Sequence, residues 1–142
     1  MMRFRSSLPV AVLLAGTVLH AQGAAPRATL KEIGKTSVGT PVMLETASVS
    51  RSGTVVTAIV RVALSPPLKH TNGELVASRT ISMFDCARQT AATRESWYYH
   101  DAAMKKEGMH RVVAKPGFGP AFKGSLADVA LAHVCAATAP AR

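Results

Sequence analysis

Acid–base chemistry would need a histidine or a carboxylate beside a nucleophile, and this chain offers few such groups. Its 142 residues hold five histidines and eight carboxylates, and His100 next to Asp101 is the pair that most resembles part of a hydrolase triad. No G-x-S-x-G motif is present, and no spacing gives either residue a partner. The carboxylates are too scattered for a paired acid/base site. We therefore predict no catalytic residues and a protein that is not an enzyme.

Metal binding is the second chemistry to consider. The two cysteines and three of the histidines are the natural ligands, but no C-x-x-C or H-x-x-x-H spacing relates them. We therefore predict no metal site and no cofactor. The residues concerned are Cys86, Cys135, His100, His110 and His133.

Basic side chains are the most abundant groups that could bind a ligand. Lysine and arginine number 17 against 8 acids, and between residues 105 and 123 five cations accompany one acid, Glu107. Such a cluster could bind an acidic polysaccharide, lipopolysaccharide phosphate or an acidic protein. The alternative is an ordinary solvated surface. The candidate anion-binding residues are Arg88, Arg94, Lys105, Lys106, Arg111, Lys115 and Lys123.

Aromatic residues gather at positions 97–99, which hold three of the seven in the chain. On a strand, Trp97 and Tyr99 would share one side and Tyr98 would point to the other. If they are exposed, Trp97 and Tyr99 are candidate aromatic contacts for a partner. The alternative, for at least one of the three, is a place in the core.

The N-terminus has the pattern of an export signal. Arg3 and Arg5 precede an apolar run at residues 8–19, and small residues follow it. The run is shorter than the roughly 20 apolar residues that cross a membrane, so we predict a signal peptide over residues 1–23, cleaved after Gly23 or after Ala21. Thr17 stands where a lipid-bearing cysteine would be, so no lipid anchor is expected.

Export has consequences for location, partners and cysteines. The mature chain would lie in the periplasm, at the cell surface or outside the cell of a Gram-negative bacterium, with no integral membrane segment. Nucleic acid is not an expected partner for an exported chain without a binding motif. In an oxidising compartment two cysteines most simply form a disulfide, here Cys86–Cys135. The alternative is two unpaired, buried cysteines. Nothing in the sequence indicates the oligomeric state.

The pattern of apolar residues predicts several strands followed by one helix. Residues 54–64 are the clearest strand, with Val56, Ala58, Val60 and Val62 on one side. Pro66 and Pro67 are expected to end it. Further strands are expected at residues 41–47, 74–85, 94–99 and 109–114, with turns at 50–53 and 72–73, a polar turn at 101–108 and irregular chain at 115–120.

The C-terminal pattern switches to a helix capped by Ser125, with Asp128 in its first turn. An apolar stripe would face the sheet, and it comprises Leu126, Val129, Ala130, His133 and Val134. Residues 24–40 read as a lead-in with room for one short edge strand, 41–136 as the domain and 137–142 as a frayed tail. The fold class is α+β, a small antiparallel sheet with one C-terminal helix packed on a face and tethered by the disulfide.

The order of these features resembles the bacterial surface-adhesin protein E family over residues 40–135. It includes a leading strand that ends in a turn with Gly53, a Val-rich strand, the pair Asp85-Cys86, an aromatic strand through Trp97, Pro116-Gly117, and a helix ending in Val134-Cys135. The resemblance implies a compact antiparallel sheet with a disulfide-tethered helix. It also implies a surface role, which in the family's namesake is binding to host extracellular-matrix proteins. This chain differs in lacking the lipoprotein cysteine and in its longer loop at 101–108.

Three functional hypotheses follow. The first is an exported, non-enzymatic binding or adhesion module for an extracellular host matrix protein or an acidic polymer. The second is a periplasmic protein that binds another envelope component or has a structural role. The third is a small enzyme of unrecognised type.

Overall fold

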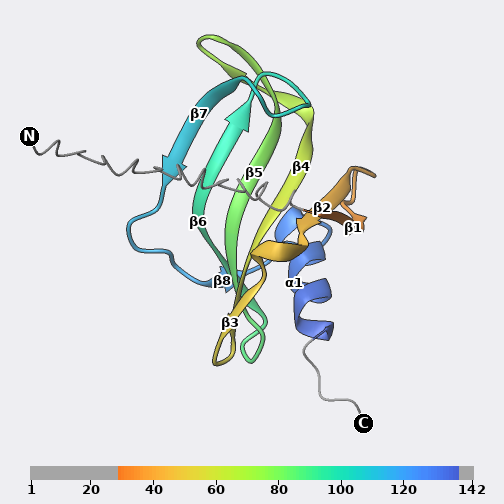
Figure 1. Cartoon of the computed structure of the whole chain (residues 1–142), viewed down its shortest axis with the longest axis vertical. Helices are drawn as coiled ribbons and strands as arrows, with labels where there is room; N and C mark the ends of the chain where they lie inside the picture. The colour runs from red at the N-terminus through yellow and green to blue at the C-terminus, as the bar shows by residue number, and fades with distance from the viewer. Residues whose placement is uncertain (1–28, 138–142) are drawn as a thin grey trace, which may run out of the picture.

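The computed structural model describes residues 29–137, so the signal peptide expected over 1–23 and residues 138–142 of the expected frayed tail lie outside it. Within this range, strands occupy most of the chain and one α-helix follows them (Figure 1). The elements are β1 (Leu30–Lys35), β2 (Pro41–Glu45), η1 (Thr46–Ser48, a 3-10 turn), β3 (Ser50–Ser52), β4 (Val55–His70), β5 (Gly73–Asp85), β6 (Thr90–Tyr99), β7 (Glu107–Val112), β8 (Gly119–Pro120) and α1 (Leu126–Ala136).

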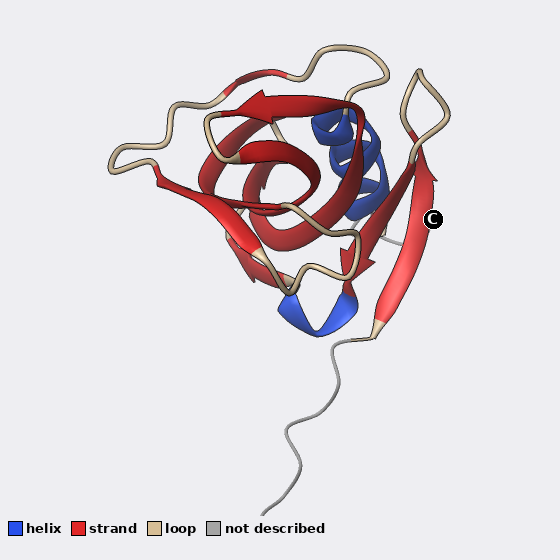
Figure 2. Cartoon of the chain, turned by 90° about the horizontal axis from the view of Figure 1, so that it is seen from above, coloured by secondary structure: helices blue, strands red, loops and turns tan. Residues whose placement is uncertain are grey.

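All strands belong to one antiparallel sheet in which chain neighbours are mostly sheet neighbours. The order is β1-β2-β4-β5-β6-β7, while the short strands β3 and β8 pair with β4 and β6. Seen from above, the sheet curls strongly and α1 lies against one side of it (Figure 2). The expected antiparallel sheet and C-terminal helix are confirmed, although this eight-stranded sheet is larger than the small one predicted.

β4 forms because a β-branched, alternating sequence buries one side of the strand. Val56, Ala58 and Val60 are almost fully buried, as expected. The prediction that Pro66 and Pro67 end this strand is wrong, since β4 continues to His70. Both prolines lie where the pairing of β4 with β5 is interrupted and beyond the part of β4 that pairs with β2. The N–H groups that proline lacks are therefore not needed for hydrogen bonds within the sheet.

α1 begins as the sequence predicts. The Ser125 hydroxyl accepts a hydrogen bond from the Asp128 backbone N–H at 3.2 Å and caps the helix. The predicted stripe omitted Leu131, which is buried together with Ala130 and Val134. Because α1 contacts β1 and β2 as well as β4, β5 and β6, a wider sector of the helix is covered than a single stripe.

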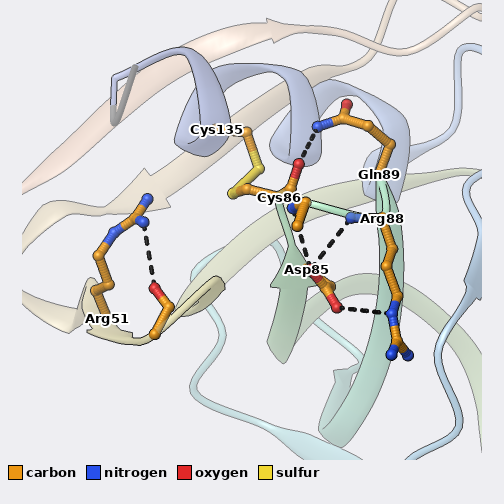
Figure 3. Close-up of a disulfide and its surroundings, with 8 residues drawn as sticks. Arg51, Asp85, Cys86, Arg88, Gln89 and Cys135 are labelled. Carbon is orange, nitrogen blue, oxygen red and sulfur yellow. Dashed lines mark hydrogen bonds and ion pairs between the residues drawn. A yellow bond between two sulfur atoms is a disulfide. The ribbon is translucent and has the colours of Figure 1, made fainter. Parts of the chain in front are cut away.

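The disulfide joins the end of β5 to the last turn of α1, as predicted. Cys86 and Cys135 are bonded, with their Cα atoms 5.4 Å apart (Figure 3). The turn after β5 is held by Asp85, whose carboxylate accepts hydrogen bonds from the backbone N–H groups of Ala87 and Arg88. The helix is therefore fixed covalently to a strand end that is itself hydrogen-bonded in place.

Alternation along the strands gives the sheet two chemically different faces. The face that carries α1, here called the helix face, holds the apolar core around Val42, Val60 and Phe84. The opposite face, here called the outer face, has no helix packed on it within residues 29–137. Met43, Arg61 and Arg79 belong to this outer face, because each lies next to a residue that points into the core.

Candidate functional site

A row of paired residues crosses the outer face from β2 to β7. The strand register places five residues side by side, each directly opposite the next. Four of them are polar or aromatic, which makes this line of the sheet a candidate binding surface. In order across the sheet they are Met43, Arg61, Arg79, Trp97 and His110.

Glu45 holds the two arginines of this row. Its Oε1 atom accepts hydrogen bonds of 2.6 Å from Arg61 Nε and from Arg79 Nε, and its Oε2 atom accepts one of 3.0 Å from Arg79 Nη2. The Glu45 side chain is 5% exposed and each arginine side chain is 26% exposed. The carboxylate is therefore the buried anchor, and the guanidinium groups extend from it toward solvent.

The charges of this cluster are coupled. Burial of the Glu45 carboxyl acts to raise its pKa, but the hydrogen bonds from Arg79 and Arg61 outweigh burial and hold the pKa below its ordinary value. The hydrogen bond to Glu45 also raises the pKa of Arg79, against the effect of burial. The Glu45 carboxyl is consequently ionised at neutral pH, where it faces two guanidinium groups.

Beyond the arginines, the row becomes a stack of planar groups. The Arg79 guanidinium carbon lies 5.1 Å from the centre of the Trp97 ring. The His110 ring lies 5.0 Å from Trp97 on centroids and only 6° from parallel. His110 Nε2 is 2.7 Å from Glu95 Oε1, and the His110 side chain is 39% exposed. Trp97 is thus fixed between two partners while part of it still reaches solvent.

An apolar hollow of about 280 Å³ lies beside the arginine end of the row. Met43 and Arg61 line it from the sheet, and Met104 covers it from the loop between β6 and β7. Within that loop, the Asp101 carboxylate accepts hydrogen bonds from the backbone N–H groups of Lys105 and Lys106. The outer face therefore combines a cation–aromatic row with an apolar depression.

The seven basic residues singled out from the sequence do not meet in one patch. Arg88 lies in the turn between β5 and β6, 3.7 Å from Asp85, whereas Lys105 and Lys106 lie in the loop at the other end of β6. The ten residues of β6 separate these ends by roughly 30 Å. The remaining members are dispersed: Arg94 at a bulge of β6, Arg111 on the helix face of β7, and Lys115 and Lys123 on exposed loops.

The two aromatic candidates share the outer face. Trp97 pairs with Arg79, and Tyr99 pairs with Ala77 on the same side of β5. Both are half-buried, and Tyr99 lies two residues from Trp97 on the same side of β6. Tyr98 points to the helix face, where it is paired with Ser78, as alternation requires.

Sequence reasoning missed most of the outer-face row. Arg61 was recognisable as a polar residue opposite the apolar side of its strand, but Glu45, Arg79 and His110 carried no local signal. Their significance depends on pairing between strands that are distant in the sequence. Correct strand registers for β2 to β7 would have revealed Arg79 and His110, because members of the row lie directly opposite one another. Glu45 lies outside the row, opposite Leu30, and would not have been found in this way.

Two further findings bear on function. Within residues 29–137, no three His, Cys, Asp or Glu side chains are grouped so that they could hold a metal ion. No helix in the same part of the chain is long and apolar enough to span a membrane.

Comparison with known proteins identifies the fold. No family model matches the chain, and no curated protein sequence matches it either. Among solved structures it is similar to Haemophilus influenzae protein E in crystal form II, with a TM-score of 0.54 and 13% identity over 80% of this chain and 95% of that one. The selenomethionine form of the same protein gives a TM-score of 0.51 and 12% identity over 80% and 93%. The resemblance expected from the sequence is thus confirmed at the level of the fold.

Proposed function

We propose that this chain is an exported, non-enzymatic binding or adhesion module that contacts a macromolecular partner through its outer face. The observation that carries the proposal is Trp97, held half-exposed between Arg79 and His110 in a row whose other end, at Met43 and Arg61, borders an apolar hollow. The shared fold with protein E supports it, because the surface-adhesin protein E family supplies the precedent for surface binding.

The chemistry of the row suits a protein interface. Tryptophan and arginine are the residues most enriched among those that dominate binding energy. Side chains that are already fixed lose less conformational entropy on binding, and here Glu45 fixes both arginines while Arg79 and His110 fix the ring. The outer face is consequently organised for contact before a partner arrives.

The partner class follows from charge. Lys105 and Lys106 are exposed on the loop whose Met104 covers the hollow, so cations border the apolar depression. An acidic segment of an extracellular-matrix protein, or an acidic polysaccharide attached to one, would satisfy both the cations and the aromatic row.

The test compares Trp97→Ala with Phe122→Ala. Phe122 is 83% exposed in the loop before α1, so its removal controls for the loss of an exposed aromatic group elsewhere. Binding of a basement-membrane extract and of heparin to the immobilised protein would be measured by interferometry. Trp97→Ala should weaken binding about 30-fold, as removal of a central aromatic anchor does, and Phe122→Ala should have little effect. Equal effects, or none from Trp97→Ala, would refute the proposed contact surface.

A second candidate is a periplasmic protein that binds another envelope component. The absence of a cysteine at position 17 favours it, since no lipid would hold the chain at the surface. Protease treatment of intact cells separates the two locations. Cleavage of the chain supports surface exposure, whereas survival in intact cells with cleavage after outer-membrane disruption supports a periplasmic location.

A further inference from the structure

The helix face changes chemistry from one half of the sheet to the other. Over β2 and β4 it is aliphatic, and α1 packs against these strands and also against β5 and β6, where Phe84 belongs to the same core. Over β5 and β6 it carries hydroxyl side chains where a closed core would carry aliphatic ones. These residues are Ser78, Thr80, Ser82, Thr93 and Ser96, and all except Thr93 are buried.

A groove of about 480 Å³ opens over this hydroxyl-bearing half. Ser78, Thr80 and Ser96 line it from β5 and β6, Tyr98 and Arg111 line it toward β7, and Leu126 lines it at the start of α1. Its volume falls within the range of pockets that hold small ligands, roughly 300–1,000 Å³. The groove is separate from the outer-face row, because its lining residues point to the opposite side of the sheet.

The hydroxyl groups in this groove are not fully used by the protein. Ser78 is only 5% exposed, yet its side chain makes no hydrogen bond to any residue of the described range 29–137. Thr80 Oγ1 and Ser96 Oγ are 3.3 Å apart, and a single hydrogen bond between them leaves one of the two hydroxyl protons to be donated elsewhere. Because these hydroxyl groups face the groove, a ligand rich in oxygen acceptors would complete their hydrogen bonding.

Arg111 gives the groove its charge. It lies directly opposite Ser96 and forms no ion pair with any residue between 29 and 137. It is the charged residue among those that line the groove. The start of α1 adds little, because the Asp128 carboxylate already accepts the Gly124 N–H there at 2.8 Å. The guanidinium therefore selects an anion, and a carboxylate matches its paired donors.

We infer that this groove binds a small, hydroxyl-rich carboxylate of sugar-acid type. Arg111 would receive the carboxylate, and Ser78 with the Thr80–Ser96 pair would donate to the hydroxyl and ring oxygens. The Tyr98 ring and the Leu126 side chain would cover the less polar face of the sugar ring. This assignment is independent of the outer-face function, since it uses other residues on the other side of the sheet.

The experiment follows backbone amide NMR signals of the intact mature protein during titration with D-glucuronate, with D-glucose as the neutral match. Glucuronate should shift the amides of Ser78, Ser96 and Arg111 with millimolar affinity, and glucose should bind at least several-fold more weakly. Arg111→Ala should weaken glucuronate binding roughly tenfold, through loss of a charge-assisted contact. Arg94→Ala is the charge-matched control, because Arg94 is exposed like Arg111 but does not line the groove.

A second pair of variants tests the hydroxyl groups that line the groove. Ser78→Ala should weaken glucuronate binding roughly fivefold, the effect of one hydrogen bond, without altering the fold. Ser82→Ala is the matched control: Ser82 is equally buried on the same strand and face but does not line this groove. Absence of glucuronate-induced shifts in the groove, or equal binding of glucose, would overturn the inference. Trp97→Ala should leave glucuronate binding intact, so failure of this site and failure of the outer-face proposal are distinguishable.

Discussion

Arg61 and Arg79 lie directly opposite each other on β4 and β5, and their Nε atoms both donate to the same oxygen of Glu45 at 2.6 Å. Like charges in this position normally destabilise a sheet. Here both guanidinium groups bind the same carboxylate, which offsets their repulsion and joins the three residues in one cluster. Because Arg79 also lies over Trp97, the cluster sets the position of the aromatic part of the candidate site.

Replacement of Glu45 by Gln should destabilise the protein by about 2 kcal/mol. Breaking a buried ion pair costs about 3–5 kcal/mol, but the arginine side chains here are 26% exposed and solvent offsets part of the loss. Urea unfolding at pH 7 measures the change. Glu32→Gln, which removes an exposed acid from β1, should have almost no effect. A similar loss in both variants would show that only net charge matters.

Stability should also fall in acid because of Glu45. Its pKa is lowered in the folded protein, so its contribution is present above the unfolded carboxyl value of about 4.3 and is lost as the pH falls through the folded value. The urea midpoint should therefore drop as the pH falls below about 4.3, and drop less in Glu45→Gln than in the wild type. Parallel pH profiles for the two proteins would contradict this assignment.

Removal of the disulfide should cost about 4 kcal/mol, the loop-closure entropy of a 50-residue loop. For a domain of this size, the double variant Cys86→Ser, Cys135→Ser should melt at least ten degrees lower, at roughly 3–6 °C per kcal/mol. Thermal unfolding followed by circular dichroism measures the shift. Adding reductant to the wild type should reproduce it, and an unchanged melting temperature would mean that apolar packing alone holds α1.

The basic loop can be tested by charge reversal. Lys105→Glu with Lys106→Glu should reduce heparin binding more than Lys31→Glu with Lys35→Glu, which makes the same change of charge on exposed positions of β1. Binding should weaken steeply with added salt, because exposed charges are screened over about 8 Å at physiological ionic strength. Equal losses in the two variants would show that no site exists at the loop.

Gly108 should not tolerate a side chain. A Cβ atom there would lie within 2.5 Å of both the His100 ring and the Leu75 side chain, so Gly108→Ala should destabilise the protein by about 1–3 kcal/mol. The comparison is Gly117→Ala, where a Cβ atom would meet nothing within 4 Å. Urea unfolding of the two variants decides between a steric effect and a general effect of replacing glycine.

Much of the fold was accessible from local patterns. The alternation around Val56 to Val62 identified β4, and Ser125 identified the start of α1. The turn expected at Asn72-Gly73 lies one residue earlier, at Thr71-Asn72, because Gly73 already pairs with His70 in the ladder between β4 and β5. Each depends on neighbours within a few residues. The errors arose where tertiary contacts decide, as for Leu131, whose burial depends on how much of α1 the curled sheet covers.

By itself, the sequence determined the alternation of faces, the hairpin turns, the capped helix and the pair of cysteines that could join. The tertiary structure alone decided which residues meet on the outer face. Near the turn, His70 pairs with Gly73, and that register would place Arg61 opposite Ser82. Between Ala63 and Leu68, around the two prolines, β4 gains three residues over β5, so Arg61 instead lies opposite Arg79. Because side chains alternate with a period of two, this odd shift moves Arg79 to the face of Arg61 and so creates the row that reaches Trp97.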